Sequence, residues 1–260
     1  MKPKALYKII CCILALAMLS CIVISSYADE CLHWYIKRNK NAAPSFPVEA
    51  EEIKKLGAIY IDDRVDEGNK KIYLTFDAGY ENGNIAKILD ILKAENITAA
   101  FFLLDNIILK NTDLVIRMAD EGHLVCNHTK NHKNLSTASE KEIEKDLRAL
   151  ETIYEEKTGR EMSKFFRFPK GEYSISALKC VKDLGYTTVF WSFAYDDWDN
   201  ARQPSAEKAI KKVLDNTHNG AIMLFHPTSD TNVQIFKELI EEWKKQGYTF
   251  GSLNEIIEGR

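Results

Sequence analysis

Short apolar runs recur along the chain from residue 72 onward, and a longer amphipathic stretch follows each of them. The short runs have the length and apolar character of buried strands, whereas the longer stretches repeat apolar residues at the spacing of a helix. The clearest helix is predicted at 138–158, with Ser136 or Ser139 as its N-cap. The predicted strands lie at 72–76, 98–103, 123–127, 165–168, 187–192, 221–225 and 248–250, and the predicted helices at 84–95, 109–121, 138–158, 174–184, 204–217, 231–246 and 252–258.

Strands that alternate with helices in this way predict an α/β fold, because a helical crossover makes neighbouring strands parallel. The runs are almost wholly apolar, as expected of strands that are covered on both faces. We expect a closed or nearly closed (β/α) barrel of about seven parallel strands. An open, doubly wound sheet is the alternative, and both architectures place a functional site at the carboxyl ends of the strands.

Residues 1–28 have the layout of a secretory signal: three lysines, an apolar run at 9–24, and small side chains at Ser26 and Ala28. Cleavage after Ala28, retention of the run as a membrane anchor, and lipid attachment at Cys21 are three alternatives. Each of them places the rest of the chain outside the cytoplasmic membrane. An exported protein is therefore expected.

The rest of the chain divides into a lead-in and one folded domain. Residues 29–70 are expected to be a linker and lead-in segment, since Pro44 and Pro47 lack the N–H donor that continues a helix. The domain is expected at 71–260, and a chain of 260 residues that is 45% hydrophobic can bury such a core. The formal net charge of −3 does not favour a nucleic-acid partner.

Ionisable side chains stand at the ends of five of the seven predicted strands, which is more regular than solvated loops require. Two histidines follow the third strand four residues apart, and histidines at that spacing on one helical turn can share a metal ion. Each residue taken alone could instead have a purely structural role, as a solvated loop histidine, a helix cap, a member of a structural ion pair or part of an acidic loop. Taken together and in this order along the chain, the residues indicate a functional site far more specifically than any one of them alone. They are Asp77, His128, His132, Arg167, Asp197 and His226.

Five short motifs around these residues resemble those of the polysaccharide deacetylases, carbohydrate esterase family four, with its NodB homology domain. The resemblance covers about residues 70–255 and implies a distorted barrel. It is nearest to the sporulation subgroup that makes muramic δ-lactam in spore cortex peptidoglycan, on residues 34–41, 76–83 and 190–194. The motifs are Thr75-Phe76-Asp77, His128-Thr129 with His132, Arg167 with Pro169 and Gly171, Asp197-Trp198, and Leu224 with His226.

The resemblance implies a role for each of these side chains. Asp77 would be the general base and His226 the general acid, while His128 and His132 would bind a divalent metal, expected to be Zn2+. Two supporting residues are implied as well, with Arg167 holding the base and Asp197 orienting the acid. The implied substrate-binding residues are Pro169, Lys170, Gly171, Trp198 and Leu224, with the Lys170 N–H as an oxyanion donor.

Two positions depart from the family pattern. Most members carry a second aspartate after the base as the third metal ligand, but this chain has Ala78, so the metal site rests on two histidines. Lys170 stands where many relatives have an aromatic residue. We hypothesise that this lysine recognises the lactyl carboxylate of a muramic acid that lacks its stem peptide.

The sequence therefore predicts a metal-assisted hydrolase that removes the N-acetyl group from N-acetylmuramic acid of peptidoglycan, in muramic δ-lactam formation. Two alternatives stay open: a deacetylase of N-acetylglucosamine polymers such as chitin, and a non-catalytic glycan-binding relative. The expected partner is a peptidoglycan glycan strand, with a membrane tether through residues 9–24 where the anchor is retained. A monomer is expected.

Overall fold

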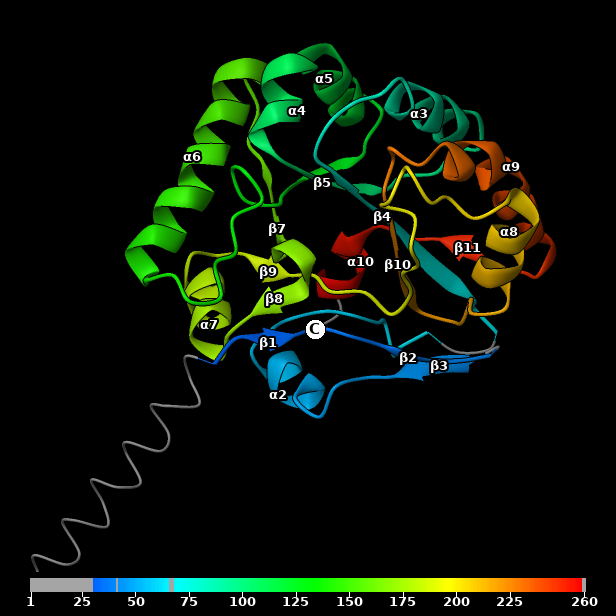
Figure 1. Ribbon diagram of the computed structural model, residues 1–260, viewed down its shortest axis with the longest axis horizontal. Helices are drawn as coiled ribbons and strands as arrows, with labels where there is room; N and C mark the ends of the chain where they lie inside the picture. Colours follow the sequence, from blue (N-terminus) through cyan, green and yellow to red (C-terminus); the bar gives the residue numbers. More distant parts are fainter. Residues whose placement is uncertain (1–29, 41, 66–67, 259–260) are drawn as a thin grey trace, which may run out of the picture.

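The computed structural model of the protein describes residues 30–40, 42–65 and 68–258 (Figure 1). The predicted signal or anchor at 1–28 lies outside these residues, and so does the proposed tether at 9–24. No helix of the described residues is both long enough and apolar enough to cross a membrane.

A curled sheet of seven strands, counted over the described residues, lies at the centre of the molecule (Figure 1). The strand order is β10, β4, β5, β6, β7, β9, with every neighbouring pair parallel, and β11 pairs with the first two residues of β4. The predicted parallel α/β architecture is thus confirmed. The strands are β4 (Lys71–Ala78), β5 (Ala100–Leu103), β6 (Leu124–Asn127), β7 (Ser163–Phe166), β9 (Thr187–Thr188), β10 (Ala221–Phe225) and β11 (Thr249–Phe250).

The space between the edge strands β9 and β10 is spanned by extended segments that form isolated bridges. The strand predicted at 187–192 is therefore shorter than expected, because its second half bonds to Ile59 and to β10 rather than continuing beside β7. These contacts bring the two edges together, so that the sheet forms a distorted barrel instead of an open sheet. The bridges join Ile59 to Val189, Ile61 to Ala221, and Phe193 to Met223.

Successive side chains of β4 point alternately to the outer core, between sheet and helices, and to the barrel interior. The even-numbered residues of 72–78 pack against the surrounding helices. Tyr73 packs inside the barrel with apolar side chains of other strands and of α10 (Leu253–Glu258), which lies near the amino-terminal end of β4. Thr75 and Asp77 continue the inward side of Tyr73, so this strand directs a carboxylate toward the carboxyl-end mouth of the barrel.

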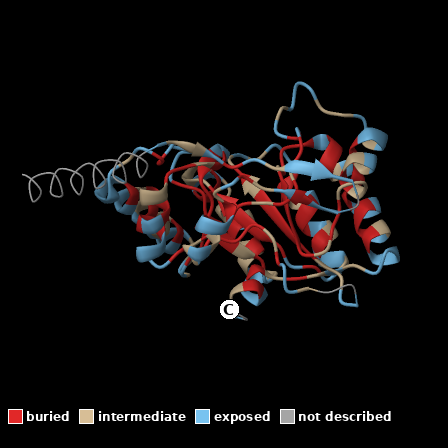
Figure 2. Ribbon diagram, turned by 90° about the horizontal axis from the view of Figure 1, so that it is seen from below, coloured by how far each residue is buried: buried red, intermediate tan, exposed pale blue. Residues whose placement is uncertain are grey.

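Helices surround the outer side of the barrel, and their buried faces meet the buried strands (Figures 1 and 2). Ser139 is the N-cap of α6 and forms a capping box with Glu142, as one of the two predicted caps. The helix predicted at 109–121 is two helices that meet at Asn111. The helices are α3 (Ile85–Ala94), α4 (Asp105–Lys110), α5 (Thr112–Asp120), α6 (Glu140–Thr158), α7 (Ile175–Asp183), α8 (Ala206–Leu214) and α9 (Asp230–Lys245).

The segment before β4, which was predicted as a linker and lead-in, packs on the barrel. Trp34 is only 4% exposed and stacks on Phe190, with 4.7 Å between ring centroids. An indole of this size buries enough apolar surface to fix a short segment. The segment contains β1 (Leu32–His33), which pairs with β8 (Glu172–Tyr173), as well as β2 (Lys37–Asn39), β3 (Ala42–Ser45) and α2 (Ala50–Lys55).

Candidate active site

A pocket of about 640 Å³ opens at the carboxyl ends of the strands. Asp77 lies in its wall near the end of β4, and the two histidines of the loop after β6 also line it. His226, which directly follows β10, lines the pocket as well. The structure therefore brings together side chains that are up to 149 residues apart in the sequence, with Arg167 and Asp197 bonded to two of them.

A buried arginine holds the carboxylate of Asp77. Arg167 is completely buried, and its Nη1 donates to Asp77 Oδ1 at 2.7 Å. The same guanidinium donates to Thr75 Oγ1 at 3.0 Å and to the Val189 carbonyl at 3.0 Å, and it lies 4.1 Å from the centroid of the Phe102 ring. These contacts fix the planar group in one orientation.

Asp77 is ionised in this setting. Burial by itself raises the pKa of the carboxyl, but the charge and hydrogen bond of Arg167, together with the charge of His226, outweigh burial, and the net pKa is lowered. A carboxylate that is anionic and held in place by a guanidinium can accept a proton from a bound water.

The protonation state of His128 follows from one hydrogen bond. Its Nδ1 lies 2.8 Å from the carbonyl oxygen of Arg167, and a carbonyl can only accept, so Nδ1 carries the proton. The lone pair is then on Nε2, which lies 3.5 Å from Asp77 Oδ2. Burial lowers the pKa of His128 to about 4, so the ring is neutral near pH 7, as a metal ligand must be.

His132 faces His128 across a tight loop, not along a helical turn. The two ring centroids are 5.1 Å apart, but Thr129 and His132 have φ angles of 71° and 61°, which are left-handed. The loop therefore brings the two rings together, and a helical turn is not needed for it. Asn127 stabilises the loop, because its Oδ1 accepts from the Thr129 N–H at 2.9 Å.

The metal half of the site, which consists of His128 and His132, offers two imidazoles. Ala78 is completely buried in the outer core and supplies no ligand atom. Over the described residues, no group of three His, Cys, Asp or Glu side chains has the arrangement of a metal site. The fixed tautomer of His128 and the neighbouring ring of His132 fit a divalent metal that completes its shell with water or substrate.

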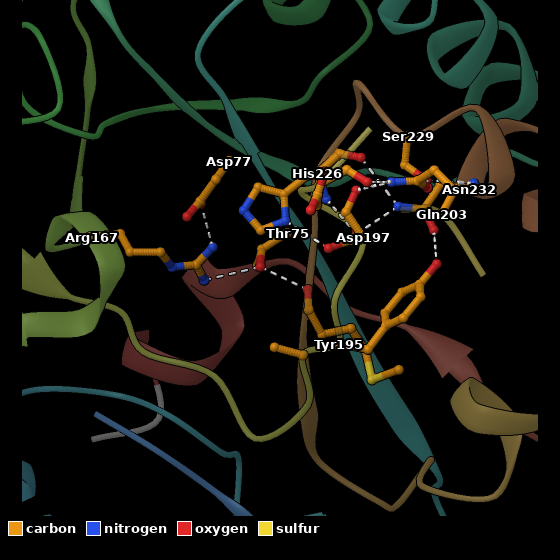
Figure 3. A network of polar contacts seen from close by, with 12 residues as sticks. Thr75, Asp77, Arg167, Tyr195, Asp197, Gln203, His226, Ser229 and Asn232 are labelled. Carbon is orange, nitrogen blue, oxygen red and sulfur yellow. Dashed lines mark hydrogen bonds and ion pairs between the residues drawn. The ribbon is translucent and has the colours of Figure 1, made fainter. Parts of the chain in front are cut away.

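The acid half of the site is held by a buried carboxylate (Figure 3). Asp197 is completely buried, and its Oδ1 accepts from His226 Nδ1 at 2.7 Å while its Oδ2 accepts from the His226 backbone N–H at 2.8 Å. Burial alone lowers the pKa of His226, but the charge and hydrogen bond of Asp197 outweigh it and raise the pKa above its ordinary value. His226 can therefore be a proton donor near neutral pH.

Asn232 completes this arrangement and was not foreseen from the sequence. It lies in the first turn of α9, where its backbone N–H donates to the capping Ser229 Oγ at 3.0 Å. Its side-chain N–H donates to Asp197 Oδ2 at 2.6 Å and also to the His226 carbonyl at 3.1 Å. The only signal in the sequence is the cap, which fixes the helix start but does not indicate the partner of the asparagine.

The predicted substrate-binding residues divide into two groups. Lys170, Trp198 and Leu224 line the pocket, and the Trp198 side chain is 59% exposed at its edge. Pro169 and Gly171 are buried and are not among the lining residues. They form the 3-10 turn that presents Lys170.

Gly171 is required in that turn for two reasons. Its φ is 68°, and a Cβ there would lie 2.9 Å from the Trp191 ring. Ten other lining residues carried no site prediction, among them Ile36, Arg38, Tyr80 and Tyr195.

Comparison with known proteins places the chain in a family. Residues 64–189 match the family model described as polysaccharide deacetylase. The chain is 35% identical over 252 residues to the peptidoglycan-N-acetylmuramic acid deacetylase PdaA of Bacillus subtilis, covering 95% of this chain and 94% of that protein. It is 31% identical over 203 residues to a peptidoglycan-N-acetylglucosamine deacetylase of Bacillus cereus, covering 76% and 93%.

A solved structure agrees with the sequence comparison. The structure of Bacillus subtilis PdaA, described as a family 4 carbohydrate esterase, superposes with a TM-score of 0.84 at 35% identity. The match covers 89% of this chain and 98% of that one.

Proposed function

This chain belongs to the polysaccharide deacetylase family of enzymes, and we propose that it removes the N-acetyl group from N-acetylmuramic acid in peptidoglycan. The observation that carries the proposal is that Asp77 and His226 line one pocket, each held by its own buried partner. The similarity to a muramic acid deacetylase over most of both chains supports the choice of substrate.

The base side activates the water. A divalent metal such as Zn2+, held by His128 and His132, would polarise the amide carbonyl and lower the pKa of a bound water. Asp77 accepts the proton of the attacking water, and Arg167 keeps its carboxylate anionic and correctly directed. The backbone N–H of Lys170 is the proposed donor to the oxyanion.

The acid side releases the amine. His226 donates its Nε2 proton to the sugar nitrogen as the C–N bond breaks, since Nδ1 is occupied by Asp197. The negative charge of Asp197 stabilises the imidazolium until that step. The products are acetate and a free amine on the sugar.

Lys170 gives the proposed preference for muramic acid. A muramic acid without its stem peptide carries a free lactyl carboxylate, and the Lys170 side chain is a cation in the pocket wall. The amine freed by deacetylation can then condense with that carboxyl, with loss of one water, to form muramic δ-lactam in spore cortex. The signal or anchor at 1–28 and the tether at 9–24 would place this monomeric enzyme outside the cytoplasmic membrane.

Mass spectrometry of the muropeptides tests the proposal. Peptidoglycan treated with the wild type and added divalent metal should lose 42 Da per muramic acid, the mass of an acetyl group replaced by hydrogen, and the Asp77→Asn protein should leave the glycan unchanged. Loss from N-acetylglucosamine alone would favour the second candidate, which the similarity to the Bacillus cereus enzyme supports. No loss from either sugar with any metal would contradict both functions.

A second variant tests the role of Lys170. Lys170→Ala should lower kcat/KM on peptide-free muramic strands by about tenfold, while neutral chitin oligomers lose little. Equal losses on the two substrates would contradict a role in carboxylate recognition.

A further inference from the structure

The N-terminal segment forms part of the pocket wall. Ile36 and Arg38 line the pocket together with residues of the strand-end loops. Arg38 lies in β2, which precedes the residues that match the family model. The pocket thus contains a group that the five motifs of the barrel do not supply.

Trp34 fixes this segment beside the catalytic loops. Its backbone N–H donates to the Gly171 carbonyl at 2.8 Å, directly next to Lys170. Its indole Nε1 donates to the Trp191 carbonyl at 2.9 Å. The buried Trp34 therefore connects the segment with both the turn of Lys170 and the loop after β9.

Arg38 reaches the pocket in a defined position. Its Nη2 donates to the Ala194 carbonyl at 2.6 Å, and Ala194 also lines the pocket. This bond uses one of five guanidinium N–H groups, so the planar group keeps donors for a second acceptor. An arginine held in this way is preorganised to bind a carboxylate through two parallel hydrogen bonds.

The charges in the pocket leave two cations available. Among the described residues, neither Arg38 nor Lys170 lies within ion-pair distance of a carboxylate. Asp77 is neutralised by Arg167, and Asp196, the other lining carboxylate, pairs with neither cation. An anionic ligand group would therefore be attracted to the pocket that these two side chains line.

We propose that Arg38 is a specificity-determining residue that binds the lactyl carboxylate of the sugar together with Lys170. The proposal rests on the proposed muramic acid deacetylation and adds a second cation from the N-terminal segment. Two cationic donors select a carboxylate over the neutral amide that a stem peptide would leave there. They also disfavour N-acetylglucosamine, which has no group for them to bind.

A pair of matched substrates tests the proposal. Peptide-free muramic strands are compared with the same strands after conversion of the lactyl carboxylates to methylamides, with acetate release as the readout. Arg38→Ala should lower kcat/KM on the carboxylate strand by about tenfold or more, mostly through KM, and leave the methylamide strand unchanged. Arg38→Lys should restore part of the loss.

Lys37→Ala is the matched control, because Lys37 is the exposed neighbour in β2 and does not line the pocket. It should behave as wild type on both strands. Equal losses of Arg38→Ala on the two strands would overturn the proposal, because a structural role affects both substrates alike. Thermal melting of each variant reports whether loss of the Ala194 contact unfolds the segment.

A binding experiment separates this inference from the proposed function. The Asp77→Asn protein is titrated with both strands, with and without Arg38→Ala, and Kd is measured by calorimetry. A weaker Kd for the carboxylate strand alone supports the inference even where turnover is absent. A Kd that is the same for both strands, or insensitive to Arg38, overturns it, whereas failure of the wild type to release acetate from muramic acid overturns the proposed function.

Discussion

The two halves of the site differ in how firmly their functional groups are held in place. The acid half places His226 against a completely buried carboxylate that three hydrogen bonds satisfy, one of them from Asn232. The metal half offers two imidazoles on a loop with left-handed residues, and Ala78 contributes nothing to it. The proton-transfer groups are thus preorganised by buried partners, whereas metal binding depends on two ligands and on what water or substrate adds.

This difference predicts which variants fail under all conditions and which recover. Loss of a preorganised acid or base removes a catalytic group that no added solute replaces. Loss of a metal ligand raises a dissociation constant, and mass action can offset it.

Asp77→Asn should have the largest effect on turnover. Asp77 is the proposed base, and the side-chain amide of an asparagine cannot accept the proton of the attacking water. We expect kcat/KM for acetate release to fall by about 10³-fold, with no recovery at any metal concentration. Metal binding by calorimetry is the control and should change little. Activity within about tenfold of wild type would mean that another group is the base.

Asp197→Asn should have the next largest effect and should change the pH profile. Asp197 raises the pKa of His226, so the protonated acid persists above the ordinary histidine range and activity is lost as pH rises through the raised pKa. Without the charge, the alkaline limb of kcat/KM should move to lower pH, and kcat should fall by about 10–100-fold. An unmoved alkaline limb would show that His226 is not the group titrated there.

His132→Gln should weaken metal binding by about 10–100-fold and leave the acid–base half intact. Activity should therefore return as the metal concentration is raised. Lys133→Ala, in the same exposed loop, is the control and should match wild type. A loss that saturating metal does not restore would contradict the assignment of His132 as a ligand.

Asn127→Ala should have the smallest effect on turnover and a clear effect on stability. The change removes the bonds from the Asn127 amide to the Leu147 carbonyl and Tyr186 Oη and leaves the buried Thr129 N–H without its acceptor, and an unsatisfied buried donor alone costs about 1–3 kcal/mol. The free energy of unfolding from urea titration should fall by that amount, and the metal Kd should rise only slightly. A stability equal to wild type would mean that the loop does not depend on the hydrogen bonds of Asn127.

Much of the fold was predictable because local periodicity carries it. The runs at 72–76 and 221–225 are the paired strands β4 and β10, and Ser139 caps α6. The second half of the run at 187–192 was not predictable as a bridge, since its partner is Ile59 from the lead-in. Contacts between distant segments leave no periodic signal in either of them.

The sequence by itself determined the strand-and-helix alternation and the ionisable residues at strand ends, because hydrophobic period and residue chemistry are local properties. Only the tertiary structure decided how these residues are held: the tautomer of His128, the burial of Asp197 and the role of Asn232. It also decided that Arg38, from a segment expected to be a linker, reaches the pocket. Hydrogen-bond partners and burial depend on segments far apart in the chain, and packing alone brings those segments together.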